Sequence, residues 1–285
     1  MRRTGLRLAA GLLALLASAC SPLTLFDTIV PKDGGVSRVV RDAAFGPDPR
    51  QRVDVYAPRR PAATRLPIIV FFYGGSWNSG SKGGYSFVGR ALAARGFVVA
   101  IPDYRLVPQV RYPGFLQDNA AAVRWVRAHA AGFGGDPDRL ILAGHSAGGY
   151  DAAMLALDPR WLGADRMAVR GLIGLAGPYD FLPFKEQVVR EAFQGVADPL
   201  STQPIAFAGA GSPPAFLATG GKDVTVRPSN SDALAAKLGK AGVPVERRIY
   251  PDVGHAGLIT ALARPLRGRA PVLDDLVAFA DRVTR

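Results

Sequence analysis

The chain has 285 residues, of which 48% are hydrophobic and 20% charged, a balance typical of a globular protein that excludes disordered and collagen-like chains. A chain of this length can bury a core without disulfides, as one large domain or two small ones. The net charge of +12 raises nucleic acid, an anionic membrane or acidic ligands as partners. The arginines form no dense run with interleaved aromatic residues, so we expect no nucleic-acid partner.

The first residues have the pattern of an export signal. Arg2, Arg3 and Arg7 precede a short apolar run, and Ala17-Ser18-Ala19-Cys20 follows it. The run is shorter than the ~20 residues of a membrane-spanning helix. A cysteine directly after small residues resembles a bacterial lipobox, which implies cleavage before Cys20 and lipidation of its thiol. We therefore expect a lipoprotein, anchored to a membrane and facing the periplasm or the outer surface.

Two features keep a second interpretation of the signal open. Ala17 stands where a lipobox usually has leucine, and Ala-x-Ala also suits the ordinary signal peptidase. A soluble periplasmic protein is therefore the alternative. Because Cys20 is the chain's single cysteine, we expect no disulfide framework, thiolate nucleophile or cysteine metal site in the mature part.

Short apolar runs alternate with helical patterns along the rest of the chain. Val53 and Val55 alternate with polar neighbours, which predicts a half-exposed strand. Continuous apolar runs predict buried strands over 66–73, 97–101 and 140–143, and later strands are expected over 171–176, 215–219 and 245–250. Helices are expected over 86–95, 116–130, 150–157, 229–241 and 271–283. This alternation predicts an α/β fold with a mostly parallel central sheet and helices on both faces. The segment 178–213 lacks periodicity, and we expect a small cap insertion there.

One motif places a serine between a predicted strand and a predicted helix. Gly144-His145-Ser146-Ala147-Gly148 follows the run 140–143 directly. A Gly-x-Ser-x-Gly sequence in this setting is typical of the nucleophile elbow of α/β hydrolases, in which a tight turn lifts the serine hydroxyl above the sheet. We therefore predict Ser146 as a nucleophile.

A serine hydroxyl needs a base, and the chain has three histidines. His129 lies in a helical pattern, and His145 cannot turn back onto its neighbour's hydroxyl. His255 follows the last predicted strand, where the hydrolase chain order Ser, Asp, His places the base. Asp223, after the penultimate strand, is the predicted third member, and Asp252 is its rival.

Acyl transfer also needs hydrogen-bond donors for an oxyanion. The N–H group of Ala147 is the first expected donor, because it directly follows the serine. The second is expected in the loop Tyr73-Gly74-Gly75-Ser76-Trp77, after the first buried parallel strand.

Several of these segments are similar to one known group of enzymes. Tyr73-Gly-Gly-Ser-Trp77 resembles the His-Gly-Gly-Gly-Trp loop of carboxylesterases related to hormone-sensitive lipase, feruloyl esterases and kynurenine formamidase. The run 102–106 and the run from Gly134 to Gly149 are similar to the same group. The likeness covers about residues 50–283. By resemblance, the oxyanion donors are Gly75, Ser76 and Ala147, and Tyr73 and Ser76 replace a histidine and a glycine of the family's loop.

The resemblance implies a serine carboxylesterase with the α/β-hydrolase fold, acting on small-molecule esters without a cofactor or metal. An amidase, formamidase or peptidase with the same residues is the alternative, and a non-catalytic binding module a third. The expected organisation is a signal peptide over 1–19, a lipid-tether segment with an edge strand over 20–49, and one catalytic domain over 50–285. The sequence does not indicate the oligomeric state or the acyl and alcohol groups of the substrate.

Overall fold

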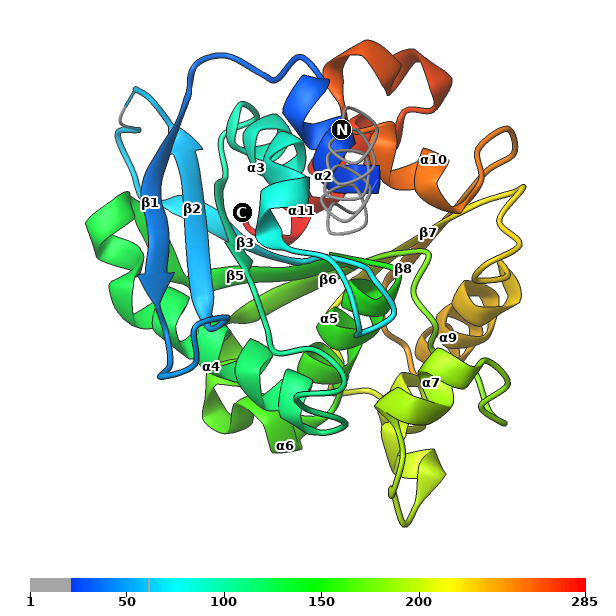
Figure 1. Cartoon of the computed structure of the whole chain (residues 1–285). Helices are drawn as coiled ribbons and strands as arrows, with labels where there is room; N and C mark the ends of the chain where they lie inside the picture. The colour runs from blue at the N-terminus through cyan, green and yellow to red at the C-terminus, as the bar shows by residue number, and fades with distance from the viewer. Residues whose placement is uncertain (1–21, 61) are drawn as a thin grey trace, which may run out of the picture.

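The computed structural model describes residues 22–60 and 62–285, and in these residues eight strands form one sheet. The spatial order is β1-β2-β4-β3-β5-β6-β7-β8 (Figure 1). The strands are β1 (Val36–Ala44), β2 (Arg52–Pro58), β3 (Leu66–Phe72), β4 (Val98–Pro102), β5 (Gly135–His145), β6 (Val169–Leu175), β7 (Ala215–Gly220) and β8 (Val245–Tyr250). β2 is antiparallel to both of its neighbours, and the other pairs are parallel. The predicted α/β-hydrolase arrangement of a mostly parallel sheet is confirmed.

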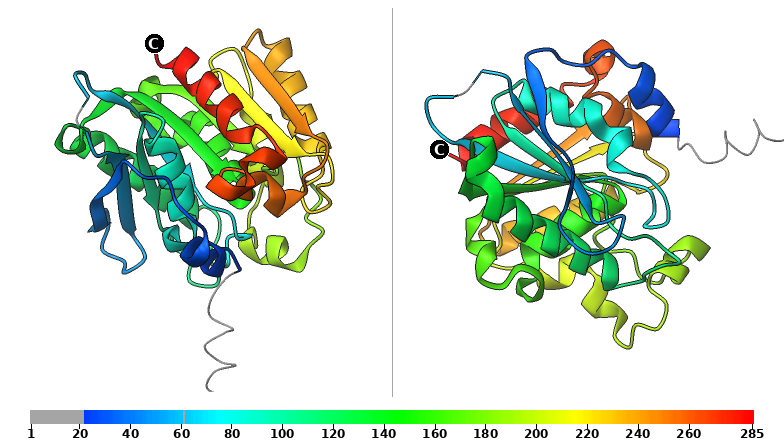
Figure 2. Two further views of the ribbon diagram at one scale, coloured as in Figure 1. Left: turned by 90° about the horizontal axis from the view of Figure 1, so that it is seen from above. Right: turned by 60° about the vertical axis from the view of Figure 1, so that its left-hand side comes forward.

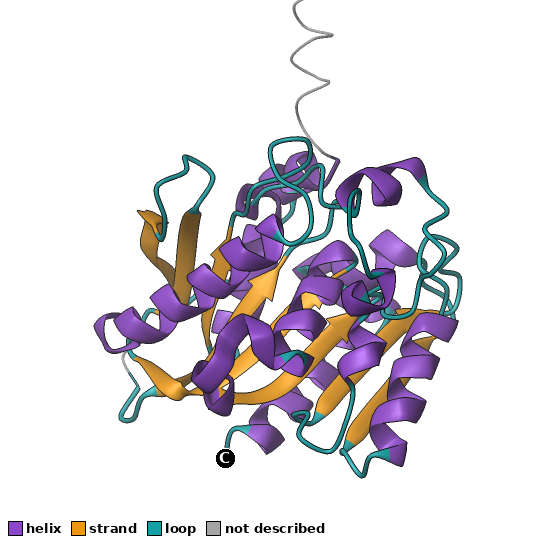
Figure 3. Cartoon of the chain, turned by 90° about the horizontal axis from the view of Figure 1, so that it is seen from below, coloured by secondary structure: helices purple, strands orange, loops and turns teal. Residues whose placement is uncertain are grey.

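Helices cover both faces of this sheet because its central strands are apolar on both sides. In β3, Ile69 and Phe71 pack with α3 (Ser86–Ala93) and α11 (Val272–Val283). Ile68 and Val70 face the opposite way, toward α4 (Gly114–His129), α5 (Ala147–Leu157) and α9 (Ser229–Lys240). Figures 2 and 3 show these two layers of helices from other sides. The predicted helices match these five to within a few residues.

The strand β2 differs from its prediction in one respect. The alternation predicts a half-exposed strand, and its apolar residues Val53 and Val55 are fully buried. Their polar neighbour Asp54 is also buried, and its carboxylate accepts a hydrogen bond from Arg38 at 2.8 Å. The polar face of β2 is therefore covered and holds the ion pair of Asp54 with Arg38. The prediction that this face is exposed to solvent is wrong.

The segment before β1 is more ordered than a plain tether. From Pro22 it forms the helix α2 (Pro22–Ile29), and the expected edge strand follows as β1. The Phe26 ring packs edge-on against Phe87 at 5.3 Å between centroids. Leu25 and Ile29 lie on the exposed side of α2. The predicted signal peptide and Cys20, the predicted site of lipid attachment, lie outside the described residues.

The expected cap lies between β6 and β7. It contains the short helices α7 (Gln187–Ala192) and α8 (Pro204–Phe207), while α6 (Pro159–Leu162) precedes β6 and α10 (His255–Thr260) follows β8. Aromatic rings attach the cap to the body of the domain: Phe193 packs against Trp77 at 5.0 Å and against Tyr150 at 5.6 Å between centroids.

None of the helices in residues 22–60 and 62–285 is long and apolar enough to cross a lipid bilayer.

Candidate active site

The strand β5 meets the helix α5 at Ser146, which has a φ of +56°. Residues other than glycine rarely adopt this backbone angle, and the surroundings of Ser146 enforce it. A Cβ atom on Gly144 would lie 2.0 Å from the Gly148 carbonyl oxygen, and one on Gly148 would lie 2.0 Å from the Phe72 oxygen. The Ser146 N–H group donates to the Leu175 carbonyl at 2.9 Å, and the side chain caps no N–H group of α5. The predicted elbow is therefore present, and Ser146 lines a pocket.

Asp223 and His255 come from different loops and meet directly. The His255 Nδ1–H group donates to Asp223 Oδ2 at 2.8 Å, which assigns the free lone pair to Nε2 because a carboxylate only accepts. The other carboxylate oxygen accepts the N–H groups of Thr225 and Val226, both at 2.9 Å. The Asp223 side chain is fully buried. Burial raises the pKa of Asp223, but the hydrogen bonds from His255 and the two N–H groups outweigh it and hold the pKa below its usual value.

In the described residues, the rival carboxylate pairs with a lysine and not with His255. Asp252 has 81% of its side chain exposed and pairs with Lys222 at 3.1 Å. His129 is also removed from the site: it is exposed at the end of α4, where its Nδ1–H group donates to the Trp125 carbonyl at 2.8 Å. These positions agree with the choice of Asp223 and His255.

His145 is buried beside the serine and supports the loop of His255. Its Nε2–H group donates to the His255 carbonyl at 3.1 Å, and the two imidazole rings lie 4.7 Å apart between centroids. Burial, together with the charge of His255, lowers the pKa of His145 from 6.5 to about 3. The predicted packing role of His145 is therefore accompanied by a contact to the loop of His255.

In the described part of the chain, the side chains of Ser146 and His255 are not hydrogen-bonded to each other.

The loop after β3 lies against the serine. A Cβ atom on Gly74 would come within 2.9 Å of the Ser146 Cβ atom, so only glycine allows this approach. The Gly74 N–H group donates to the Tyr85 hydroxyl at 3.2 Å and is thereby occupied. Ser76 has a φ of +50°, and Ser76 and Ala147 both line the pocket. In residues 22–60 and 62–285, no acceptor is hydrogen-bonded to the N–H groups of Gly75, Ser76 and Ala147.

A buried carboxyl group fixes the far end of this loop. Trp77, with a φ of +59°, donates its Nε1–H group to Asp151 Oδ1 at 3.1 Å. The Asn119 amide donates to the other oxygen at 3.0 Å. Complete burial raises the pKa of Asp151 well above its ordinary value, against the effect of these two bonds. Asp151 lies on α5, which begins directly after Ser146, so the loop and Ser146 share one support.

The pocket above Ser146 has a volume of about 520 Å³. Its cap wall is formed by the segment around Phe181 and by Val188 and Val189, and its opposite wall is formed by 224–230. Four charged side chains also line it, two of each sign: Asp180, Glu186, Lys185 and Arg227. Within the described residues, no three His, Cys, Asp or Glu side chains are grouped so that they could hold a metal ion.

Sequence reasoning missed the residues that support this site from a distance. Arg50, Tyr85 and Asp151 belong to none of the motifs, and their partners lie 11 to 74 positions away along the chain. A run such as 49–51 carries no periodicity or spacing that would single out its arginine. These contacts require the folded chain.

Known proteins share this fold and these elements. An esterase B structure from Lactobacillus rhamnosis superposes with a TM-score of 0.77 over 96% of each chain at 21% identity, which shows a common fold. The carboxylesterase NlhH of Mycobacterium tuberculosis is 33% identical over 231 residues, which cover 72% of this chain and 70% of that protein. A probable isoprenylcysteine alpha-carbonyl methylesterase of Oryza sativa is 29% identical over 85% of this chain. The chain spans 62% of the length of that rice protein.

Fold, elbow and relatives together place the chain among the carboxylesterase-type α/β hydrolases. Residues 53–238 match the BD-FAE family, and the chain belongs to that family.

Proposed function

We propose that this protein hydrolyses carboxylic esters of small molecules, with Ser146 as nucleophile, His255 as base and Asp223 as the group that orients the base. The observation that carries the proposal is the hydrogen bond from His255 to the buried Asp223 carboxylate, together with a serine held at a positive φ. The esterase names of the relatives support the reaction type.

The first half of the reaction forms an acyl-enzyme. His255 Nε2 takes the Ser146 proton while Oγ bonds to the ester carbonyl carbon, and the carbonyl oxygen becomes an oxyanion. The free N–H groups of Gly75, Ser76 and Ala147 are the proposed donors to that oxyanion. The bond between the carbonyl carbon and the alcohol oxygen then breaks, and His255 gives its proton to the departing alcohol.

The second half repeats these steps with water. His255 takes a proton from water, the hydroxide oxygen bonds to the acyl carbon, and the bond to Ser146 Oγ breaks as the serine regains its proton. The products are a carboxylic acid and the free enzyme. Asp223 stays charged throughout, because its pKa lies below the usual value, and it stabilises the imidazolium formed in both halves.

Replacement of the nucleophile tests this proposal. We expect Ser146→Ala to lower kcat for a short-chain nitrophenyl ester by at least about 10⁴-fold. The matched control is Ser229→Ala, because Ser229 lines the same pocket and has no role in the proposed chemistry. Activity of the Ser146→Ala protein within about tenfold of wild type would contradict the proposal.

The relatives favour ester over amide hydrolysis, since their names are those of esterases. Kinetics with an ester and an amide that share the same acyl group test this preference. We expect a higher kcat/KM for the ester. A faster amide would indicate an amidase, formamidase or peptidase, and the absence of turnover with both, together with no phosphonate labelling, would indicate a binding module.

We also propose that the enzyme is exported and anchored to a membrane by a lipid on Cys20. The lipobox-like sequence supports this location, and the net charge of about +9 that remains without Arg2, Arg3 and Arg7 favours an anionic membrane surface. Cell fractionation tests the anchor: we expect wild type in the membrane fraction and Cys20→Ala in the soluble periplasmic fraction. An unchanged distribution would contradict the lipid anchor.

A further inference from the structure

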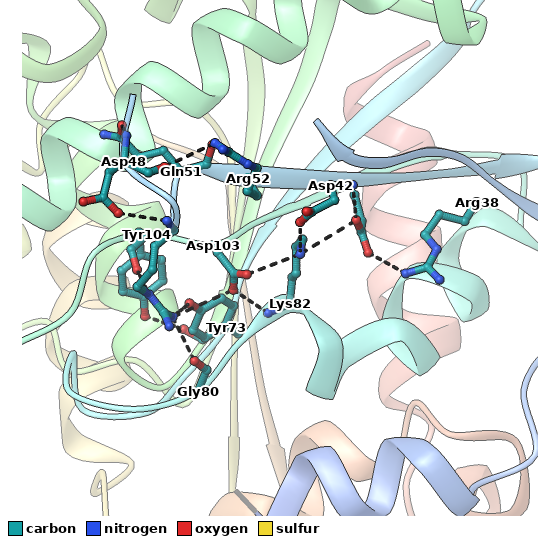
Figure 4. A network of polar contacts seen from close by, with 12 residues as sticks. Arg38, Asp42, Asp48, Gln51, Arg52, Tyr73, Gly80, Lys82, Asp103 and Tyr104 are labelled. Carbon is teal, nitrogen blue, oxygen red and sulfur yellow. Dashed lines mark hydrogen bonds and ion pairs between the residues drawn. The ribbon is translucent and has the colours of Figure 1, made fainter. Parts of the chain in front are cut away.

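Arg50 lies in the loop between β1 and β2, and its guanidinium contacts the start and the end of the loop 73–80, which contains Trp77. Its Nη2–H groups donate to the Tyr73 hydroxyl and to the Gly80 carbonyl, both at 3.0 Å. Its Nε–H group donates to the Tyr104 carbonyl at 2.9 Å. Figure 4 shows Tyr73, Gly80 and Tyr104 gathered at one end of this polar network. The Arg50 side chain thus links its own loop to the loop 73–80 and to the backbone at Tyr104.

The loop 73–80 requires such support because its backbone is strained. Ser76 and Trp77 are two consecutive non-glycine residues with positive φ. Each residue in this region costs about 1–3 kcal/mol and persists only where the surroundings determine it. Inside the loop, the N–H groups of Asn78 and Ser79 donate to the Gly75 carbonyl at 3.1 and 3.0 Å. These bonds define the turn but do not attach it to the rest of the domain.

External contacts attach the loop at separate points. On one side Asp151 holds the Trp77 indole, and on the other Arg50 holds Tyr73 and Gly80. Tyr73 is fully buried, and the Tyr104 hydroxyl donates to its carbonyl at 3.0 Å. Tyr73 stands where the resembled loop has histidine, and its phenol oxygen is the acceptor that Arg50 uses.

The position of Arg50 is itself fixed. Its N–H group donates to Asp48 Oδ1 at 2.8 Å, and its guanidinium lies 3.9 Å from the Asp103 carboxylate. Asp103 in turn accepts the Lys82 N–H group at 2.7 Å, just beyond the end of the loop. A planar guanidinium with five donors can serve three acceptors at once, whereas a lysine ammonium is a compact charge on a flexible stem.

We propose that Arg50 is a positioning residue that holds the loop 73–80 in the conformation that presents the N–H groups of Gly75 and Ser76 to the oxyanion. Arg50 does not touch the reacting atoms. Its effect on rate rests on the proposed esterase function, but its effect on the loop does not. Loss of the guanidinium lets the strained residues relax, which weakens stabilisation of the transition state more than binding of the substrate.

The test compares Arg50→Ala with Arg50→Lys and with the matched control Arg52→Ala. Arg52 is two positions away, and in the described residues its side chain donates to the carbonyls of Asp48 and Gln51 in its own hairpin loop. We expect Arg50→Ala to lower kcat about 10- to 100-fold and to leave KM within about threefold of wild type. This loss of kcat is no larger than the loss caused by removing one oxyanion donor. Arg50→Lys should recover only part of kcat, and Arg52→Ala should keep kcat within about twofold.

Hydrogen exchange of the peptide 73–80 supplies a readout that does not depend on turnover. The N–H groups of Gly74, Asn78 and Ser79 are hydrogen-bonded in the wild type, and we expect them to exchange at least about tenfold faster in Arg50→Ala but not in Arg52→Ala. Should Arg50→Ala fail to fold, Tyr73→Phe removes one acceptor of Arg50 and should raise exchange in the same peptide.

The two readouts separate the failure of each proposal. Unchanged exchange in 73–80, or a loss of kcat that Arg52→Ala shows equally, overturns the role of Arg50. A wild-type protein without esterase activity overturns the proposed function, and the exchange comparison still decides whether Arg50 holds the loop.

Discussion

The orientation of His255 depends on one carboxylate oxygen. Asp223 Oδ2 accepts the Nδ1–H group at 2.8 Å, while Oδ1 is occupied by two backbone N–H groups. The carboxylate cannot rotate without losing three hydrogen bonds, so the imidazole is held in one tautomer with Nε2 unprotonated.

Removal of this charge gives the first prediction. Asp223→Asn should lower kcat about 10³- to 10⁴-fold, because an amide can donate to Nδ1 and select the wrong tautomer. Asp252→Asn is the control, since Asp252 is exposed and should leave steady-state kinetics unchanged. Comparable losses in the two variants would rule out the assignment of Asp223.

Ser76 gives the second prediction, which separates its backbone from its hydroxyl. Ser76→Ala removes the hydroxyl and keeps the strained φ, whereas Ser76→Gly also relieves the strain. If the N–H group is the donor, both variants should keep kcat within about threefold of wild type. The free energy of unfolding, measured with urea, should change by no more than about 1 kcal/mol. A loss above about tenfold in both variants would assign the donor role to the hydroxyl.

At the scale of the elements, the helix α2 stabilises the start of α3. The helix α3 lacks a capping side chain of its own, and Asp27 of α2 supplies one from outside. Its Oδ1 atom accepts the Phe87 N–H group at 2.7 Å, and its Oδ2 atom accepts the Ser86 hydroxyl at 2.6 Å. α3 packs on β2 and β4, so this cap joins the N-terminal segment to the sheet.

We therefore predict that Asp27→Ala lowers the free energy of unfolding by about 1–2 kcal/mol, as the loss of a helix cap does. Chemical denaturation measures this difference. Thr28→Ala, on the exposed side of α2, should cost less than about 0.5 kcal/mol. Equal effects of the two substitutions would mean that Asp27 does not act as a cap.

The elements show which patterns can be read from a sequence. The buried strands and the long helices were predicted because apolar periodicity records burial directly. The helix α2 was missed because an eight-residue helix is stabilised by its contacts with other elements rather than by its own pattern. The exposure of β2 was misjudged because the ion pair of Asp54 with Arg38 covers the polar face, and a single strand's sequence does not show its partner.

At the scale of the whole molecule, stability depends on a buried histidine. The pKa of His145 falls from 6.5 in the unfolded chain to about 3 in the folded one. As the pH falls through 6.5, the unfolded chain takes up a proton that the folded chain does not. The unfolded state then binds more protons, and His145 lowers the stability progressively until the pH reaches about 3.

The fourth prediction follows from this loss of stability at low pH. Between pH 7.5 and pH 5, wild type should lose about 2 kcal/mol more unfolding free energy than His145→Gln, which keeps a donor near the His255 carbonyl. Urea unfolding at both pH values measures the difference. An identical pH dependence in wild type and His145→Gln would contradict the buried, neutral state of His145.

The whole fold also explains how far the site could be predicted. Ser146, Asp223 and His255 follow three parallel strands, β5, β7 and β8, whose carboxyl ends meet at one edge of the sheet. Chain order and motif spacing therefore suffice to select these three residues as candidates from the sequence. The pocket walls and Arg50 depend on loops that meet only in the folded domain, so the sequence did not predict them.

The most direct test of the account is the site of reaction with a fluorophosphonate. Wild-type protein is labelled, digested and analysed by mass spectrometry, with Ser146→Ala treated in parallel. We predict a phosphonylated Ser146 in the wild type and no labelled serine in the variant, because only an activated hydroxyl reacts. A label on a different serine, or no label on the wild type, would contradict the assignment of Ser146 as the nucleophile.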